Sequence, residues 1–369
     1  MANKGYHSYR GRRSGRNRLL VAALALLLVA ACAYLFLQRY LRYTDDGGMY
    51  FALPFLEERE ESPPPREDEP EREVELVIGD GLEEEAPEEA EVYGERRLVG
   101  VSSLPEDSAA LTSLLDQAGA NGAVFTVRDN TGLARYTSTA ALGDAVADDA
   151  MNAQALARLL QETEAVTVAR FNCFHDSYYA WANMETAGLC QPSGYIWYDD
   201  LSYHWLDPAK EAARQYVIGL AVECAQLGFD ELLLEEARYP AAGNLEKIRY
   251  HGGAEGRTDA LVSFLTELRE ALEPYGTKVS LLVEGSLLTA EGDPAYAETT
   301  GVDLSRLLPL VDAVYAETED PDGAQAALEA LAGEGEVPAL VPLWTPAEDE
   351  TETGEEDQTV PPEGNWYLP

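Results

Sequence analysis

Basic residues are scarce in this chain. Its 369 residues include 26 lysines and arginines against 67 aspartates and glutamates, so the formal net charge is -41. A protein with this charge repels the phosphate backbone of nucleic acids, whose binding proteins carry basic patches. We therefore predict no nucleic-acid partner.

Cysteine is also rare, with four residues in the whole chain. This argues against a disulfide framework of the kind that holds small secreted domains together. Cys32 lies in an apolar segment, and Cys224 lies in a predicted helix, where we expect a buried thiol. Cys173 and Cys190 either pair in an oxidising compartment or stay free, and three cysteines always leave one over.

Motifs for metal binding are missing as well. The chain has four histidines, and neither CxxC nor HExxH spacing occurs in it. His175, His204 and His251 are scattered without the spacing of metal ligands, and we interpret them as polar loop residues. The sequence therefore predicts no metal site and no cofactor.

One long apolar run without charges does occur, at residues 19–37, and it is about long enough to cross a bilayer as a helix. Residues 1–18 carry six basic side chains and no acidic one. This predicts a cytoplasmic tail, a single-pass span and a folded part outside the cell. A signal anchor would keep the span, whereas a lipoprotein signal would be cut before Cys32. Apolar residues continue past Cys32, which favours the anchor.

An acidic segment follows the apolar run. Residues 57–91 hold 17 acidic and three basic side chains and almost no aromatic ones. Such a segment cannot bury enough apolar surface to fold, and its charges repel one another. We predict that residues 38–95 form a disordered acidic linker. A second acidic run, residues 348–363, is interpreted as a solvated loop.

From residue 96 onward, strand and helix patterns alternate. The predicted strands are residues 98–102, 123–128, 166–171, 231–235, 278–284, 313–317, 339–344 and 365–368. The predicted helices lie near residues 106–118, 151–163, 208–227, 258–274, 303–310 and 323–333. The third helix is the clearest, because Asp207 can cap it, Pro208 suits its first turn and Gly228 suits a left-handed exit.

This pattern predicts an α/β fold, a (β/α)8 barrel over residues 96–369, whose length is usual for that architecture. The alternative is an open doubly wound sheet. Such a sheet would be expected to show a glycine-rich turn after its first strand, and none follows residues 98–102. In a barrel, polar residues at the carboxyl ends of the strands lie where enzymes carry out their chemistry.

Five segments resemble, in order, the motifs of a family of bacterial extracytoplasmic proteins classed as glycoside hydrolase-like. They read AVFTVRDNTG (123–132), VARF (168–171), GYIWYDDLSYHWLDP (194–208), FDELLLEEARYP (229–240) and GNWYL (364–368). The resemblance implies a (β/α)8 barrel that acts on sugars. The chain departs from the family at strand ends, where Thr126 and Glu235 replace aspartates and Glu236 replaces a tyrosine.

Glycoside cleavage usually needs two carboxyl groups. Because side chains alternate along a strand, only one of Glu235 and Glu236 is expected to face the barrel mouth, and the resemblance favours Glu235. Glu284 and Glu317, which end the next two strands, are candidates for the second group. Each candidate also has a structural interpretation. Glu235 could form a stabilising ion pair with Arg238, and Glu284 and Glu317 could be solvated acids in loops.

Several further residues are candidates for substrate binding. Asp129 has this role by the resemblance, although its Asp-Asn-Thr-Gly setting is also an ordinary turn. Strand-end arginines would hold the glutamates ionised. A long loop, residues 172–207, is rich in aromatic rings that either form a sugar platform or pack on one another. The predicted binding residues are Arg128, Asp129, Arg170, Arg238, Trp197, Tyr198 and Trp205.

These observations predict a membrane-anchored glycosidase-like barrel that acts on cell-envelope or environmental polysaccharide. One alternative is a degenerate barrel that binds glycan without cleaving it. Another is a cell-surface assembly module whose aromatic loop binds a protein. The sequence leaves open the glycan, the stereochemistry of cleavage and the oligomeric state.

Overall fold

The structure is a computed structural model that describes residues 41–43, 49–51, 93–344 and 364–369. The chain divides into two compact units, residues 1–84 and 85–369. In the first, strands β1 (Leu41–Tyr43) and β2 (Met49–Phe51) pair antiparallel. The predicted tail, span and most of the acidic linker, and the 348–363 run, lie outside the described residues. Within those residues, no helix has the length and apolar character needed to cross a bilayer.

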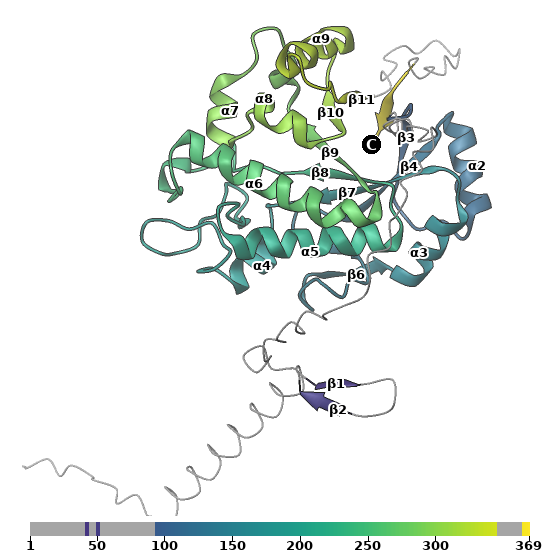
Figure 1. Cartoon of the computed structure of the whole chain (residues 1–369), viewed down its shortest axis with the longest axis horizontal. Coiled ribbons are helices and arrows are strands. Elements are labelled where there is room, and N and C mark those ends of the chain that lie inside the picture. Colours follow the sequence, from purple (N-terminus) through teal and green to yellow (C-terminus); the bar gives the residue numbers. More distant parts are fainter. Residues whose placement is uncertain (1–40, 44–48, 52–92, 345–363) are drawn as a thin grey trace, which may run out of the picture. The chain divides into compact units, whose positions relative to one another are not determined.

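Eight parallel strands close into a barrel in the second unit (Figure 1). In order around the barrel they are β3 (Arg97–Val101), β4 (Gly122–Arg128), β7 (Val166–Asn172), β8 (Glu231–Glu235), β9 (Lys278–Val283), β10 (Ala313–Glu317), β11 (Ala339–Leu343) and β12 (Trp366–Leu368). Parallel pairing of β12 with β3 completes the ring. The predicted parallel barrel is therefore confirmed, and the open doubly wound sheet was the wrong alternative.

Helices cover the outside of the barrel (Figure 1). The α-helices are α2 (Ser108–Ala118), α3 (Ala153–Glu162), α4 (Ser177–Ala182), α5 (Glu211–Leu227), α6 (Ala254–Leu272), α7 (Pro294–Thr300), α8 (Leu304–Leu307) and α9 (Pro321–Ala332). Short 3-10 turns cover Leu245–Lys247, Glu273–Tyr275, Gly285–Leu288 and Leu308–Leu310. Each of the six predicted helices is present, with its ends shifted by a few residues.

The start of α5 differs from the prediction. The helix begins at Glu211 with Lys210 as its N-cap residue, so neither Asp207 nor Pro208 belongs to its first turn. The carbonyl of Asp207 instead accepts a hydrogen bond from the Lys210 amide at 2.9 Å, in a separate turn that precedes the helix. The predicted exit is confirmed, because Gly228 ends α5 in the left-handed conformation at φ 105°.

Some short elements were not predicted. Strand β5 (Ala134–Tyr136) pairs antiparallel with the end of β4, and β6 (Val146–Met151) pairs with β5, so the sheet extends past the barrel wall. Helices α4 and α7 have six and seven residues. Strand β5 and the two short helices show too few periods of hydrophobic patterning for recognition, and β6 lacks an apolar run because two exposed aspartates lie at its centre.

Strand alternation sorts side chains between the barrel interior and the helix layer. In β8, Leu233 packs with interior residues of the other strands, whereas Leu232 and Leu234 belong to the core between strands and helices. Glu231 and Glu235 have the same parity as Leu233, so they point inward at the two ends of the strand. One carboxylate is thus placed at each end of the barrel.

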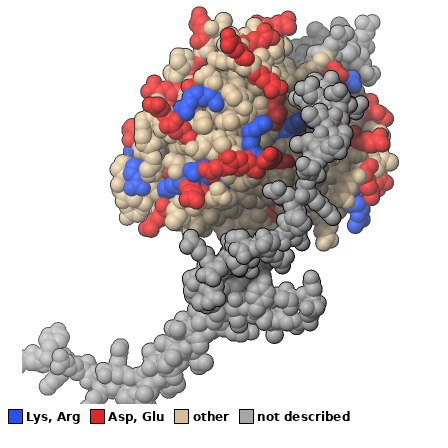
Figure 2. Space-filling view, in the orientation of Figure 1, with Lys and Arg blue, Asp and Glu red and all other residues tan. Residues whose placement is uncertain are grey.

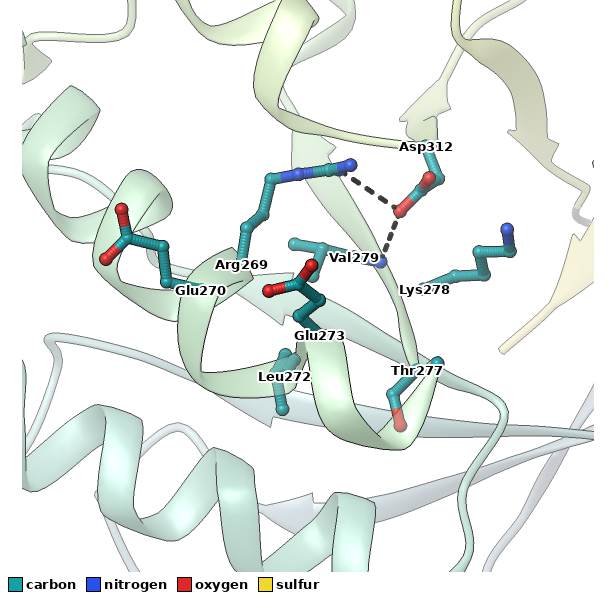
Figure 3. A pocket seen from close by; sticks show the side chains of 9 residues that line it. Arg269, Glu270, Leu272, Glu273, Thr277, Lys278, Val279 and Asp312 are labelled. Atoms are coloured by element: carbon teal, nitrogen blue, oxygen red, sulfur yellow. Dashed lines mark hydrogen bonds and ion pairs between the residues drawn. The ribbon is translucent and has the colours of Figure 1, made fainter. Parts of the chain in front are cut away.

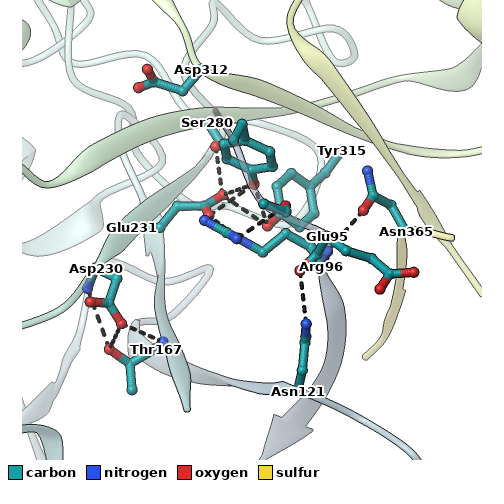
Figure 4. A network of polar contacts seen from close by, with 12 residues as sticks. Glu95, Arg96, Asn121, Thr167, Asp230, Glu231, Ser280, Asp312, Tyr315 and Asn365 are labelled. Carbon is teal, nitrogen blue, oxygen red and sulfur yellow. Dashed lines mark hydrogen bonds and ion pairs between the residues drawn. The ribbon is translucent and has the colours of Figure 1, made fainter. Parts of the chain in front are cut away.

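Glu231 is the centre of a buried polar network at the amino-terminal end of the strands (Figure 4). It is fully buried and forms an ion pair with Arg96 Nε at 3.1 Å. Its oxygens also accept hydrogen bonds from the hydroxyls of Tyr93, Ser280 and Tyr315 at 2.6–2.9 Å. A buried carboxylate satisfied in this way closes the bottom of the barrel.

The three cysteines of this unit, Cys173, Cys190 and Cys224, are buried free thiols, so Cys173 and Cys190 do not pair. Cys224 lies inside α5, as predicted.

Acidic side chains are spread over the visible face of this unit and outnumber basic ones there (Figure 2).

Candidate active site

A cleft of about 360 Å³ opens at the carboxyl ends of the barrel strands. Its lining includes one residue from each of four neighbouring strand ends, and these are Arg170, Glu235, Glu284 and Glu317. Active sites of (β/α)8 enzymes lie at this face of the barrel. The structure therefore brings together the three glutamates that the sequence predicted as catalytic candidates.

Glu235 is held at the inner wall of the cleft by an ion pair. Its Oε1 lies 2.7 Å from Nη2 of Arg170, which comes from the neighbouring strand β7. The Glu235 side chain is 14% exposed and that of Arg170 is 34% exposed, so both charges still reach the cleft. The alternative pairing with Arg238 was wrong, because Arg238 contacts the next residue, Glu236.

Glu236 also lines the cleft, and this was not expected from strand alternation. Its backbone takes the left-handed conformation at φ 48°, which turns the chain at the strand end. For a residue other than glycine, such a conformation costs about 1–3 kcal/mol and is often found at functional sites. Two consecutive carboxylates are thereby presented to the same cleft. No local sequence pattern predicts a glutamate in the left-handed conformation. The only indication that Glu236 lines the cleft was its position directly after the strand.

The electrostatic setting of Glu236 differs from that of Glu235. Burial raises the pKa of the Glu236 carboxyl above its ordinary value; the charge of Arg238 opposes this, and the negative charges of Glu235 and Glu284 add to it. Nη2 of Arg238 lies 2.6 Å from Glu236 Oε2. The side chain of Glu236 is 28% exposed. The cleft therefore contains one carboxyl group, that of Glu236, whose surroundings keep it protonated to higher pH than usual.

Glu284 and Glu317 lie side by side at the rim of the cleft, and both are exposed. A Cβ atom added to Gly285 would come within 2.1 Å of the Glu317 carbonyl oxygen. Only glycine therefore allows the two strand ends to approach this closely. Within the described part of the chain, neither side chain takes part in an ion pair, so both remain available to a ligand or to solvent.

Arg128 and Asp129 do not line this cleft, although both contact Asn172, which does. A β-bulge between Thr126 and Arg128 shifts the register of β4, and it turns Arg128 toward the buried carboxylate of Asp176. Arg128 is also buried and donates to the Cys173 carbonyl at 2.8 Å. Asp129 caps its own turn, accepting from the Thr131 amide at 2.9 Å. Both contacts organise the loop under the rim, and neither residue lines the cleft.

The three aromatic residues singled out in the long loop lie outside the cleft lining. Trp197 and Trp205 are buried, and their indole nitrogens donate to the Asn244 carbonyl at 3.1 Å and to Asp199 at 3.2 Å. Tyr198 is 53% exposed. The Arg238 guanidinium lies 5.4 Å from the centre of the Trp205 ring. Trp205 therefore supports the cleft through Arg238 and not as a sugar platform within it.

Within residues 93–344 and 364–369, no group of three or more His, Cys, Asp or Glu side chains has a metal-binding arrangement.

A second hollow, of about 400 Å³, lies at the opposite end of the barrel (Figure 3). There Asp312 accepts from the Val279 amide at 2.7 Å and lies 3.5 Å from Arg269, so it connects the starts of two strands.

The fold and the cleft define a (β/α)8 barrel with a carboxylate-lined cleft at its mouth, and comparison with known families gives its class. Residues 101–316 match the family described as "Putative glycosyl hydrolase domain", and the chain belongs to this family. A comparison with curated proteins found no match.

Similar solved structures include three barrels. A hypothetical protein from Ruminiclostridium thermocellum is 23% identical, with 48% of this chain and 92% of that chain covered and a TM-score of 0.40. The glycoside hydrolase domain of PelA from Pseudomonas aeruginosa is 15% identical, with coverage of 67% and 82% and a TM-score of 0.39. A chitinase from Chromobacterium violaceum is 15% identical, with coverage of 68% and 68% and a TM-score of 0.38.

Proposed function

We propose that this protein is an extracytoplasmic glycoside hydrolase that cleaves polysaccharide of the cell envelope or the environment in the cleft at the barrel mouth. The observation that carries the proposal is the ion pair of Glu235 with Arg170, 2.7 Å apart, in a cleft that holds further carboxyl groups. Family membership supports the reaction class.

Glycoside hydrolysis needs one ionised and one protonated carboxyl group on opposite sides of the scissile bond. Glu235 suits the first role, because the guanidinium of Arg170 lies within ion-pair distance and supplies the counter-charge of a carboxylate. It would either attack the anomeric carbon or take a proton from the attacking water. The second group must come from the same cleft, where Glu236, Glu284 and Glu317 are available.

A glycan-binding barrel without turnover is the second candidate. Glu235 and Glu236 each form an ion pair with an arginine, and such pairs also occur where they only stabilise a strand end. The exposed rings of Trp181, Tyr195 and Tyr198 outside the cleft would suit binding to a glycan or to a protein partner.

The test uses the full-length protein and a panel of polysaccharides: chitin, chitosan, cellulose, xylan, galactan and bacterial cell wall. We expect new reducing ends from at least one of them with the wild type. Glu235→Gln should lose cleavage by about a hundredfold or more and keep binding. Glu319→Gln, an exposed neighbour outside the cleft lining, is the matched control and should cleave normally. Binding without wild-type cleavage would favour the second candidate, and neither activity would leave only the assembly role.

The proposal includes a membrane anchor formed by residues 19–37, with the barrel outside the cell. It is supported by the length of the apolar run and by the six basic residues before it. Protease added to intact cells should degrade the barrel, and alkaline extraction should leave the protein in the membrane. Cys32→Ser should not change its size or its membrane retention if the span is an anchor. A shift in either would indicate a lipoprotein, and a barrel protected in intact cells would contradict the orientation.

A further inference from the structure

The proposed reaction needs a proton donor for the leaving group. Three glutamates of the cleft, Glu236, Glu284 and Glu317, are candidates for that role. Glu284 and Glu317 are exposed at the rim of the cleft. Glu236 is set deeper, next to Glu235. We propose that Glu236 is the general acid that protonates the leaving group, an assignment that rests on the proposed function.

The backbone at Glu236 is the first observation that carries this assignment. Its left-handed conformation sends the side chain into the cleft, whereas simple alternation would send it to the opposite face. Two hydrogen bonds hold this conformation, from the amides of Cys173 and Phe174 to the carbonyls of Glu235 and Glu236, at 2.8 Å and 3.3 Å. A strained backbone fixed from a neighbouring element is what positions a functional side chain.

The fixed position of Arg238 is the second observation. Its guanidinium lies over the rings of Trp205 and Tyr296, 5.4 Å and 5.9 Å from their centres. Packed against these two rings, it contacts Glu236 Oε2 at 2.6 Å. Among the described residues, none hydrogen-bonds to Glu236 Oε1, so this oxygen is available to carry a proton toward the substrate.

Glu236 and Glu235 together account for every proton and electron pair that moves in the reaction. The proton on Glu236 moves to the glycosidic oxygen as the bond from that oxygen to the anomeric carbon breaks, and the electron pair of the bond stays on the oxygen. Glu235 attacks the anomeric carbon, or it removes a proton from the water that attacks. In the first case a water molecule then attacks the anomeric carbon of the glycosyl–Glu235 ester, Glu236 takes its proton, and the sugar leaves with Glu235 restored. Burial and the nearby charges of Glu235 and Glu284 raise the pKa of Glu236, which keeps the donor protonated to higher pH against the opposing charge of Arg238.

The dependence on the leaving group tests this role. A natural polysaccharide needs a proton donor, whereas a dinitrophenyl glycoside does not, because its leaving group is already a weak base. For Glu236→Gln we expect a loss of about 10²- to 10⁴-fold on the panel polysaccharide that the wild type cleaves fastest. The same variant should retain most of its activity on the dinitrophenyl glycoside of that sugar. Glu319→Gln, the control for charge outside the cleft lining, should treat both substrates alike.

The pH profile gives a second readout. A general acid must be protonated, so wild-type cleavage should fall as the pH rises through the pKa of Glu236, and this alkaline limb should be absent from the residual activity of Glu236→Gln. Glu236→Gly adopts the left-handed backbone without strain. It should fold at least as well as the wild type and lose the same polysaccharide activity, which keeps the test valid if the glutamine variant folds poorly.

Equal losses of Glu236→Gln on the polysaccharide and the dinitrophenyl glycoside, or a pH profile unchanged from the wild type, would overturn the role of Glu236. The proposed hydrolase activity would still stand if the wild type cleaves the polysaccharide. Failure of the wild type to cleave any substrate would overturn both. A merely structural ion pair predicts a lower melting temperature and no discrimination between leaving groups.

Discussion

At the scale of single residues, the two inward-facing glutamates of β8 have opposite environments. Glu231 is sealed at the bottom of the barrel with every oxygen bound, whereas Glu235 lies at the open end with one arginine partner. The strand therefore places the same residue type in a stabilising network at one end and in the proposed active-site cleft at the other. Burial and the number of partners, not residue identity, separate the two roles.

Replacing Glu231 tests the structural half of this statement. Glu231→Gln leaves the buried Arg96 without a counter-charge, and the loss of one partner of a buried pair costs about 3–5 kcal/mol. Urea unfolding followed by circular dichroism should show this decrease. The control is Asp259→Asn, in an exposed pair with Arg306 at 2.8 Å, where we expect a change below about 1 kcal/mol. Equal effects of the two substitutions would mean that the network contributes no special stability.

At the scale of elements, buried apolar runs identified the barrel strands well. β8 and β10 begin and end at the predicted residues, because an apolar run bounded by polar groups has few alternative pairings. What could not be predicted depends on single-residue departures from regular strands. Beside the bulge, the Arg128 side chain pairs with the buried Asp176 and does not line the cleft, and the left-handed Glu236 brings an extra carboxylate into the cleft. Neither departure leaves a local pattern in the sequence.

The junction between β9 and the turn that follows it depends on one glycine. Gly285→Ala would place a Cβ against the Glu317 carbonyl, so the two strand ends must separate. We expect a loss of stability of about 1–3 kcal/mol and weaker activity, since the cleft rim moves. Gly219, an exposed helical position with open space around it, provides the matched control. Gly219→Ala should raise stability by about 0.5–1 kcal/mol. A neutral Gly285→Ala would show that the rim is not tightly packed.

At the scale of the whole molecule, closure of the barrel depends on its shortest barrel strand. β12 has three residues, yet it pairs with β11 on one side and with β3 on the other. Trp366 within it is buried, and its ring centre lies 5.7 Å from that of Trp344. The closing strand therefore stabilises the barrel through its large side chains as well as its hydrogen bonds.

Truncation of Trp366 should therefore be costly. Trp366→Ala removes a fully buried aromatic side chain, and we expect a loss of about 3–5 kcal/mol in the free energy of unfolding. Tyr275→Ala, at a surface position that is 42% exposed, should cost much less. Chemical denaturation of the two variants compares them directly. A loss at Trp366 no larger than that at Tyr275 would argue that the barrel is stable without β12.

The central claim is that the cleft around Glu235 hydrolyses glycosidic bonds, and one measurement addresses it most directly. The full-length protein is incubated with the polysaccharide panel in water labelled with heavy oxygen, and the products are examined by mass spectrometry. Hydrolysis at the anomeric carbon predicts one labelled oxygen at each new reducing end for the wild type, and about a hundredfold fewer such ends for Glu235→Gln. The absence of labelled ends with every glycan, or equal labelling by the Glu235→Gln variant, would contradict the account.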